Sequence, residues 1–349
     1  MKKKNSTAQR KKVKFDNKYL KDSKIKKIYL TFKKQLYSQI NNEKFCIAVS
    51  GGPDSLALAF LGKIFSKEFN SKFIALIIDH NLRKESGTEA RKVKKILTKH
   101  KIRTKILTWK GKIPKSNIQS NARNIRYFLL NKECNKLDIK NLVLAHHEGD
   151  LIENFFIRLF RGSGLKGLSS LNIKRHSKNN ILNLIRPLIN TKKNELIYIS
   201  KKVFKFYLTD PSNFKEKFLR TRIRNYLDKF KLDGLDINKV KLTLSNLQSA
   251  NESINYYKEK SIKNYVRYLQ HNSCFVSYGL FSYESEEVIF RTISDIISKI
   301  SDSYYPPRGK DVKNLITRMQ SKKFKKSTLG GCIIDKTYNS IIFRKEFGA

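Results

Sequence analysis

Residues 44–55 have the sequence KFCIAVSGGPDS, and this stretch decides the fold. Residues 44–50 form a short apolar run with β-branched side chains, which is typical of a buried strand. Two glycines follow and allow a tight turn, and residues 54–69 then carry apolar side chains at helical spacing. A strand, a glycine-rich turn and a helix in this order indicate a site where the helix N-terminus can bind a phosphate.

The alternation of strands and helices continues along the chain. Strands are expected at residues 73–79, 102–109, 141–145, 181–185 and 206–208, and helices at 86–100, 117–137, 149–161 and 192–204. Because the strands are apolar throughout, they predict a parallel sheet that is covered on both faces. We therefore expect an α/β fold with a parallel, Rossmann-like sheet flanked by helices, whose ligands bind beyond the carboxyl ends of the strands.

The pattern changes after about residue 230. Amphipathic helices are expected at residues 237–269 and 288–300, and a β-hairpin from residues 328–334 and 340–344. The sequence thus predicts a basic N-terminal extension (1–43), an α/β domain (44–232), and a smaller, mainly helical C-terminal domain (233–349) that ends in the hairpin.

The charge balance restricts the class of partner. The 349 residues include 74 lysines and arginines but only 29 aspartates and glutamates, a formal net charge of +45. This excess argues against a metabolic enzyme acting alone on small neutral molecules and favours a polyanionic partner, although a compositional bias toward lysine can supply part of it. The chain has no apolar run long enough for a membrane span, and its four cysteines lack metal-ligand spacing. We expect a cytoplasmic protein without membrane contact.

The glycine-rich turn is the first candidate site. Its backbone can cradle a phosphate, but it has neither the GxxxxGK[ST] nor the GxGxxG pattern. Asp54 would repel a bare phosphate, so its presence indicates an intervening Mg²⁺, or else a helix cap in an ordinary turn. The candidate nucleotide-binding residues are Ser50, Gly51, Gly52, Pro53, Asp54 and Ser55, with Asp54 as the candidate metal ligand.

A second group of candidates consists of His146, Asp150 and Glu153. The two carboxylates are three residues apart and therefore lie on one side of the expected helix. In so basic a chain, such a pair at the mouth of the sheet indicates a cation ligand. A transition metal is one alternative, and a helix cap by Asp150 is another.

Arginines at helical spacing form the third group. Arg123 and Arg126 share a helix face and could clamp phosphates, whereas the plainer alternative is a solvated basic surface. A later set could bind RNA phosphates or stack on an unpaired base. It comprises Arg158, Arg161, Arg220, Arg222 and Arg224, of which Arg220 and Arg224 share a face and are the first candidates.

The SGG-x-DS turn after a first strand resembles the signature of the PP-loop superfamily, the N-type ATP pyrophosphatases. Further motifs at residues 79–86, 117–127, 144–154, 158–168, 186–188 and 210–224 follow in order. Together they resemble the tRNA(Ile)-lysidine synthetase family over residues 45–230, and the terminal TLGG hairpin is also similar. The resemblance implies that ATP adenylates the wobble cytidine of a tRNA(Ile) with a CAU anticodon, after which lysine displaces AMP at C2.

The resemblance also implies roles for the candidate residues. The 50–55 loop would hold the pyrophosphate part of ATP, and Asp54 would place Mg²⁺. The acids Asp150 and Glu153, with His146 beside them, would bind free lysine. The C-terminal domain would position the tRNA, and self-association into a homodimer is left open. Three positions depart from the family pattern: Leu151 replaces Gln, Asn154 replaces Thr, and Thr221 replaces Asn.

Two other functions compete with this interpretation. A PP-loop tRNA thiolase would need paired cysteines or an iron–sulfur cluster near the site, but Cys46 and Cys134 are expected in a strand and in a helix away from the motifs. A non-catalytic RNA-binding protein would have no reason to hold acidic side chains against RNA. Release of pyrophosphate that depends on lysine and tRNA separates the three.

Overall fold

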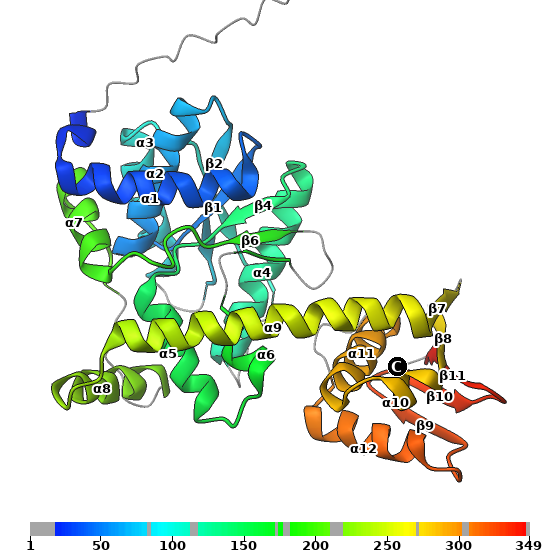
Figure 1. Cartoon of the computed structure of the whole chain (residues 1–349). Helices are drawn as coiled ribbons and strands as arrows, with labels where there is room; N and C mark the ends of the chain where they lie inside the picture. Colours follow the sequence, from blue (N-terminus) through cyan, green and yellow to red (C-terminus); the bar gives the residue numbers. More distant parts are fainter. Residues whose placement is uncertain are drawn as a thin grey trace, which may run out of the picture. The chain divides into compact units, whose positions relative to one another are not determined.

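The computed structural model describes residues 18–81, 85–111, 118–171, 174–176, 182–209, 219–269, 272–301 and 307–346. The chain forms two compact units, Met1–Ile237 and Asn238–Ala349 (Figure 1). The expected domain boundary lay after residue 232. None of the helices among the described residues is long and apolar enough to cross a membrane.

A six-stranded sheet organises the first unit, with the order β3-β2-β1-β4-β6-β5. Five strands run parallel: β1 (Phe45–Val49), β2 (Phe73–Asp79), β3 (Thr104–Thr108), β4 (Asn141–Val143) and β6 (Asn183–Ile185). The predicted parallel sheet is confirmed. The antiparallel edge strand β5 (Lys174–His176) was not predicted, and the strand expected at residues 206–208 does not form.

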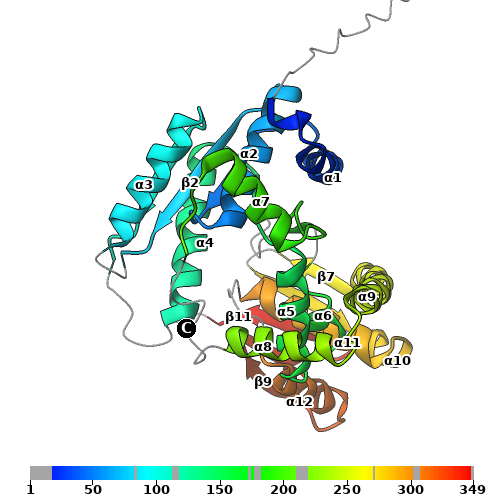
Figure 2. The same ribbon diagram turned by 90° about the vertical axis from the view of Figure 1, so that its left-hand side faces the viewer.

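Helices cover both faces of this sheet (Figure 2). Alternate residues of β1 point to opposite sides, as the pleat requires. Phe45, Ile47 and Val49 enter a core shared with α2 (Pro53–Glu68), α3 (Ser86–Lys99) and α7 (Lys193–Phe204). On the other face, Cys46 packs in a core with α4 (Ile118–Lys136). The sheet is therefore buried on both sides, as its apolar strands predict.

The helix α1 (Ser23–Ile40) is part of the first core. Asp22 caps it by accepting a hydrogen bond from the Ile25 amide, and Phe32 and Leu36 are fully buried. The prediction that these residues form a basic N-terminal extension is therefore incomplete. The many lysines of α1 obscured a regular helical spacing of its apolar residues, at positions 25, 28, 32 and 36. A short 3₁₀ turn, η1 (Lys18–Lys21), precedes the helix.

The second unit combines helices with a five-stranded antiparallel sheet of order β7-β8-β11-β10-β9. Its elements are α9 (Ile237–Tyr265, which begins at the last residue of the first unit), β7 (Val266–Leu269), β8 (Ser273–Ser277), α10 (Gly279–Tyr283), α11 (Glu286–Ile300), α12 (Gly309–Gln320), β9 (Lys326–Leu329), β10 (Cys332–Lys336) and β11 (Ser340–Lys345). The helices and the terminal antiparallel strands agree with the prediction. The prediction missed β7 and β8, and the strand expected at residues 328–334 is divided by a turn at Gly330 and Gly331, whose φ angles are 61° and 79°.

Candidate active site

The site lies where the strand order of the first sheet reverses. β1 and β4 are neighbours, although two strands separate them in sequence. The glycine-rich loop follows β1, and α5 (Glu148–Leu159) begins shortly after β4. The carboxyl ends of adjacent parallel strands meet at one edge, and a reversal of strand order leaves a crevice there. The phosphate-loop candidates and the acidic candidates are thereby brought together.

Hydrogen bonds from one serine shape the loop. The Ser55 hydroxyl oxygen accepts bonds from the amides of Ser50 (3.2 Å) and Gly51 (3.1 Å), and the hydroxyl donates to the Gly52 carbonyl (3.0 Å). Gly51 has a φ of 87°, which favours glycine. Its carbonyl accepts a 2.9 Å bond from the Leu208 amide, so the chain after α7 is tied to the loop.

Replacing Gly51 with alanine tests this arrangement. A Cβ there would lie 2.5 Å from Val93 Cγ2 and 2.8 Å from Leu208 Cδ1, in a backbone conformation that a side chain disfavours. We expect Gly51→Ala to destabilise the protein by about 2–3 kcal/mol. Thermal unfolding would then show a midpoint lower by roughly 5–10 °C.

Gly52→Ala is the matched control. Gly52 has a φ of −69°, and the nearest atom to an added methyl group would be Ser50 Oγ at 3.6 Å. Its unfolding midpoint should stay within about 2 °C of the parent. Equal losses in the two variants would contradict the special role of position 51.

Asp54 lies in the first turn of α2, behind the loop. Its Oδ2 atom is 3.7 Å from His147 Nε2, whereas its Oδ1 atom is buried without a hydrogen-bond partner among the described residues. Burial raises the pKa of Asp54, and the nearby charge of Asp150 adds to this, while His147 opposes it. A buried carboxylate oxygen without a partner is costly, and a bound cation would relieve that cost.

His147 is the residue between the two groups of acids. It is the N-cap of α5, where the Gly149 amide donates to its Nδ1 atom at 3.0 Å. The other ring nitrogen, Nε2, lies 3.7 Å from Asp54 Oδ2 and 3.7 Å from Asp150 Oδ2. The His147 amide donates to Asp150 Oδ2 at 3.1 Å.

The residue predicted from the sequence was His146, and His147 was missed. In the structure, Arg186 Nε donates to His146 Nδ1 at 3.1 Å. Burial lowers the pKa of His146 to about 3, so this ring is neutral at physiological pH. The missed signal was positional, because His147 is three residues before Asp150, as the first residue of a capping box must be.

Asp150 and Glu153 face two arginines of α8 (Leu219–Leu232), which packs beside α5. Arg220 donates from Nε to Glu153 Oε2 at 2.7 Å and from Nη2 to Asp150 Oδ1 at 3.1 Å. Arg224 donates from Nε to Glu153 Oε1 at 2.5 Å. The structure thus unites four of the predicted site residues in one ion-pair cluster.

Neighbouring groups favour the ionised form of Asp150. Burial acts to raise the pKa of Asp150, but His147, Arg220 and the hydrogen bond from the His147 amide outweigh it, and the pKa lies below its ordinary value. Burial acts to lower the pKa of Arg224, but the hydrogen bonds that Arg224 donates to Glu153 and the negative charge of Glu153 raise it. Glu153 is only 5% exposed, whereas the Arg220 side chain is 47% exposed. The acids are therefore fixed in the protein, while Arg220 reaches them from the solvent side.

Comparison with known proteins identifies the family. Residues 24–230 match the model of the PP-loop domain. The chain is 35% identical over 319 residues to the tRNA(Ile)-lysidine synthase of Orientia tsutsugamushi (strain Boryong), covering 88% of this chain and 70% of that protein. It is 33% identical over 328 residues to the tRNA(Ile)-lysidine synthase of Rickettsia felis (strain ATCC VR-1525 / URRWXCal2), covering 92% and 74%. The chain belongs to the tRNA(Ile)-lysidine synthase family.

A solved structure shares the fold of this synthase-family chain. The U34-tRNA thiolase NcsA from Methanococcus maripaludis, solved with its [4Fe-4S] cluster, has a TM-score of 0.56 and 20% sequence identity. The alignment covers 66% of this chain and 81% of the thiolase chain. At this identity the likeness concerns the fold alone.

The other predicted arginines of this synthase-family member lie on α4, near the end of α5 and on α8. Arg123 on α4 places its guanidinium over the Tyr127 ring, 5.1 Å from the centroid, and contributes to the low pKa of His146. Arg126 is close enough to His80 to help lower the pKa of that histidine. Arg158 and Arg161 lie near the end of α5 beyond the acids, and Arg222 is exposed on α8.

The three departures from the synthetase pattern have different settings. Asn154 donates from Nδ2 to Ser170 Oγ at 3.1 Å, Thr221 is buried in α8, and Leu151 is half-buried in α5. The motif residues at 82–84, 117 and 210–213 lie outside the described residues.

Asp54 is the residue best suited to help bind a metal. In the part of the chain that the structure describes, no three histidine, cysteine or acidic side chains are grouped to hold a metal ion by themselves. Mg²⁺ in nucleotide enzymes is typically bound by one or two carboxylates together with substrate phosphates, and the unpartnered Asp54 Oδ1 fits that donor set.

Proposed function

We propose that the protein catalyses ATP-dependent ligation of lysine to C2 of the wobble cytidine of tRNA(Ile) with a CAU anticodon, giving lysidine, AMP and pyrophosphate. The observation that carries this proposal is the position of His147 between two acids. Its Nε2 atom lies 3.7 Å from Oδ2 of the loop residue Asp54 and 3.7 Å from Asp150 Oδ2. A phosphate loop and a cation-binding acid pair thus lie within one site. Such a site can activate an oxygen with ATP and present an amine to the activated carbon.

In the first half-reaction the loop binds ATP. The N-terminus of α2, which directly follows the turn at residues 50–52, suits the phosphates. Asp54 would help to hold Mg²⁺, which supplies charge neutralisation for the departing pyrophosphate. The cytidine O2 then attacks the α-phosphorus, and the bond between the α- and β-phosphates breaks. The exposed guanidiniums of Arg123 and Arg220 suit the phosphate oxygens, and Arg224 supports Glu153 beside them.

In the second half-reaction the acids receive lysine. We propose that the ε-ammonium displaces Arg220 from Asp150 and Glu153, because that arginine is half-exposed and its bonds are exchangeable. A carboxylate accepts one proton from the ammonium, and the freed amine attacks C2. The C2–N bond forms, the C2–O2 bond breaks, and AMP leaves with that oxygen. His146, which is neutral and accepts a hydrogen bond from Arg186, is assigned a positioning role.

The cysteine positions argue against a thiolase. All four cysteines of the chain are free and buried. Cys46 and Cys134 belong to the core beneath the sheet, and Cys274 and Cys332 belong to the core of the second unit. Burial raises the pKa of Cys274 to about 12 and that of Cys332 to about 11, so neither is a ready thiolate. Free, buried cysteines also suit the cytoplasm, where we place the reaction.

The second unit is assigned to tRNA binding. The net charge of +45 favours a polyanion as partner, and the unit carries exposed lysines and tyrosines, such as Tyr256 and Tyr257 on α9. Positive charge contributes phosphate contacts, and exposed rings contribute stacking.

Mass analysis of the wobble nucleoside tests the proposed function. Purified protein is incubated with ATP, Mg²⁺, lysine and a tRNA(Ile) transcript with a CAU anticodon, and a transcript with uridine at the wobble position is the control. We expect lysidine in the first transcript only, with pyrophosphate release that requires both lysine and tRNA. Modification that requires a sulfur donor would indicate a thiolase, and the absence of pyrophosphate would indicate a binding protein.

A further inference from the structure

An apolar, largely aromatic surface lies at the far ends of the two helices that carry the site. Phe156 lies between two other phenylalanines, with ring centroids 6.4 Å from Phe160 and 6.4 Å from Phe230. Phe160 is 57% exposed, and Phe230 is also exposed. We call this surface the aromatic patch; its residues are Phe156, Phe160 and Phe230. Further exposed apolar side chains on the same two helices are Leu159, Tyr226 and Leu232.

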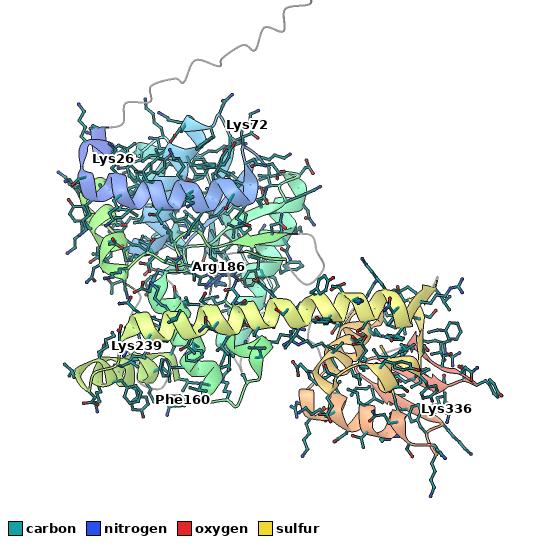
Figure 3. All side chains as sticks on the ribbon, viewed as in Figure 1. Lys26, Lys72, Phe160, Arg186, Lys239 and Lys336 are labelled. Atoms are coloured by element: carbon teal, nitrogen blue, oxygen red, sulfur yellow. The ribbon has the colours of Figure 1, made fainter. Side chains whose placement is uncertain are left out.

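The aromatic patch continues directly from the acid cluster. Glu153, Phe156 and Phe160 are spaced by three and then four residues, so they follow one stripe along α5. At 1.5 Å per residue, the stripe brings Phe160 about 10 Å beyond Glu153 along the helix axis. Figure 3 shows Phe160 at the end of α5 that is remote from the sheet. In stacked RNA this distance corresponds to roughly three nucleotides.

The charge around the aromatic patch selects among partners. Residues 156–166 contain three basic side chains and no acidic one. On α8, Arg222 and Lys229 are exposed, and the exposed Asp228 is paired with Lys231. Two copies of such a surface would repel one another, whereas a phosphate backbone would be attracted. Exposed rings among basic side chains are the means by which proteins bind unpaired bases.

We propose that the aromatic patch is a stacking platform for the unpaired RNA bases that flank the reacting cytidine. This inference rests on the proposed function, because it takes the cytidine to lie at the acid cluster. Phe160 supplies the exposed ring, Phe156 lies next to it, and Phe230 lies next to Phe156. Arg161 and Lys229 lie at the border, where they suit the phosphates between the stacked bases.

The test compares Phe160→Ala with Phe128→Ala. Phe128 is 56% exposed on α4 of the same unit and is therefore a matched loss of one exposed ring. The probe is an RNA hairpin with a CAU anticodon loop, and binding is measured by fluorescence anisotropy. We expect Phe160→Ala to raise the Kd for the hairpin and the KM for tRNA by roughly 5- to 100-fold. The KM values for ATP and lysine, and the unfolding midpoint, should not change, and Phe128→Ala should resemble the parent.

Two further substitutions separate base stacking from simple apolar contact. Phe160→Leu retains an apolar side chain but removes the ring, so it should lose most of the affinity. Phe160→Trp retains an aromatic ring, so it should preserve the Kd. Binding of the hairpin should then quench the fluorescence of the new tryptophan. The chain has only one natural tryptophan, Trp109, so a parent titration provides the baseline.

Other outcomes would overturn the proposal. An unchanged Kd in Phe160→Ala, in a preparation whose parent forms lysidine, would reject the platform and leave the proposed function intact. A parent that binds the hairpin but forms no lysidine would reject the proposed function. Concentration-dependent dimers that dissociate on Phe160→Ala, seen by sedimentation without a change in hairpin affinity, would assign the patch to a second copy of the chain.

Discussion

Asp54→Asn is expected to abolish most of the activity while leaving the fold at least as stable as the parent. The carboxylate lies behind the phosphate loop with its Oδ1 atom buried and unpartnered among the described residues. Asp54 would act through the Mg²⁺ that it helps to hold, and loss of one group that stabilises transition-state charge typically costs 10²- to 10³-fold in kcat. Lysine- and tRNA-dependent pyrophosphate release measures this loss. In the same variant, removal of a buried charge should raise stability by about 1 kcal/mol at neutral pH, or roughly 2–4 °C in the unfolding midpoint.

The pH dependence of that stability gain has a definite sign. The pKa of Asp54 is raised in the folded protein, so the folded state holds its proton more tightly than the unfolded state, whose value is near 3.8. The ionised group therefore opposes folding fully above the raised pKa and not at all below about 3.8. The advantage of Asp54→Asn should be greatest at neutral pH in metal-free buffer and should disappear as the pH falls through this window.

Asp138→Asn is the matched control for this substitution. Asp138 pairs with Lys44 at the surface of the same unit, and its side chain is 84% exposed. The Asp138→Asn variant should retain full activity and should have the same unfolding midpoint as the parent. Activity in Asp54→Asn within tenfold of the parent at saturating Mg²⁺ would remove Asp54 from the metal site.

Asp150→Asn has the second largest expected effect, and it acts on a different substrate. The ionised Asp150 would give the lysine ammonium a charge-assisted hydrogen bond, worth about 2–3 kcal/mol. Its loss corresponds to an increase of roughly 30- to 150-fold in the KM for lysine. The KM for ATP should change by less than about threefold, since Asp150 is on α5 and the loop precedes α2.

Steady-state kinetics with one substrate varied at a time measures this split. The asparagine oxygen can still accept from the His147 amide, so the capping of α5 is retained and the change is one of charge. Asp138→Asn again provides the control, with an unchanged KM for lysine. An Asp150→Asn enzyme with parental lysine kinetics would disprove the assignment of this acid to lysine.

The fold of the first unit follows from local signals, because its strands are apolar runs between amphipathic helices. Local sequence likewise predicts the turn at Gly51 and Gly52. The spacing of Asp150 and Glu153 predicts that both acids lie on one side of a helix. The helix α1 was not predicted, because its lysines outweighed a regular row of buried residues, Ile25 and Phe32 among them.

What the sequence did not predict depends on contacts between distant residues. β8 pairs with β11, whose residues follow more than sixty positions later, so nothing near residue 275 indicates a sheet. Arg220 and Arg224 were predicted as phosphate ligands, and their bonds to Glu153 and Asp150 depend on how α8 packs against α5. The choice between His146 and His147 likewise depended on where α5 begins.

The position of His147 links the binding of the two ligands. One imidazole lies between the acid assigned to the metal and the acid assigned to the amine, and it is only 3% exposed. A ligand that binds the carboxylate of Asp54 or Asp150 weakens the interaction of that carboxylate with the His147 ring. The ring can then interact more strongly with the other carboxylate, so the two binding equilibria are linked. Such linkage is reciprocal: whatever factor Mg²⁺ and ATP contribute to lysine affinity, lysine must return to them. Cooperativity between an inorganic ion and an amino acid would then be a property of a single buried side chain.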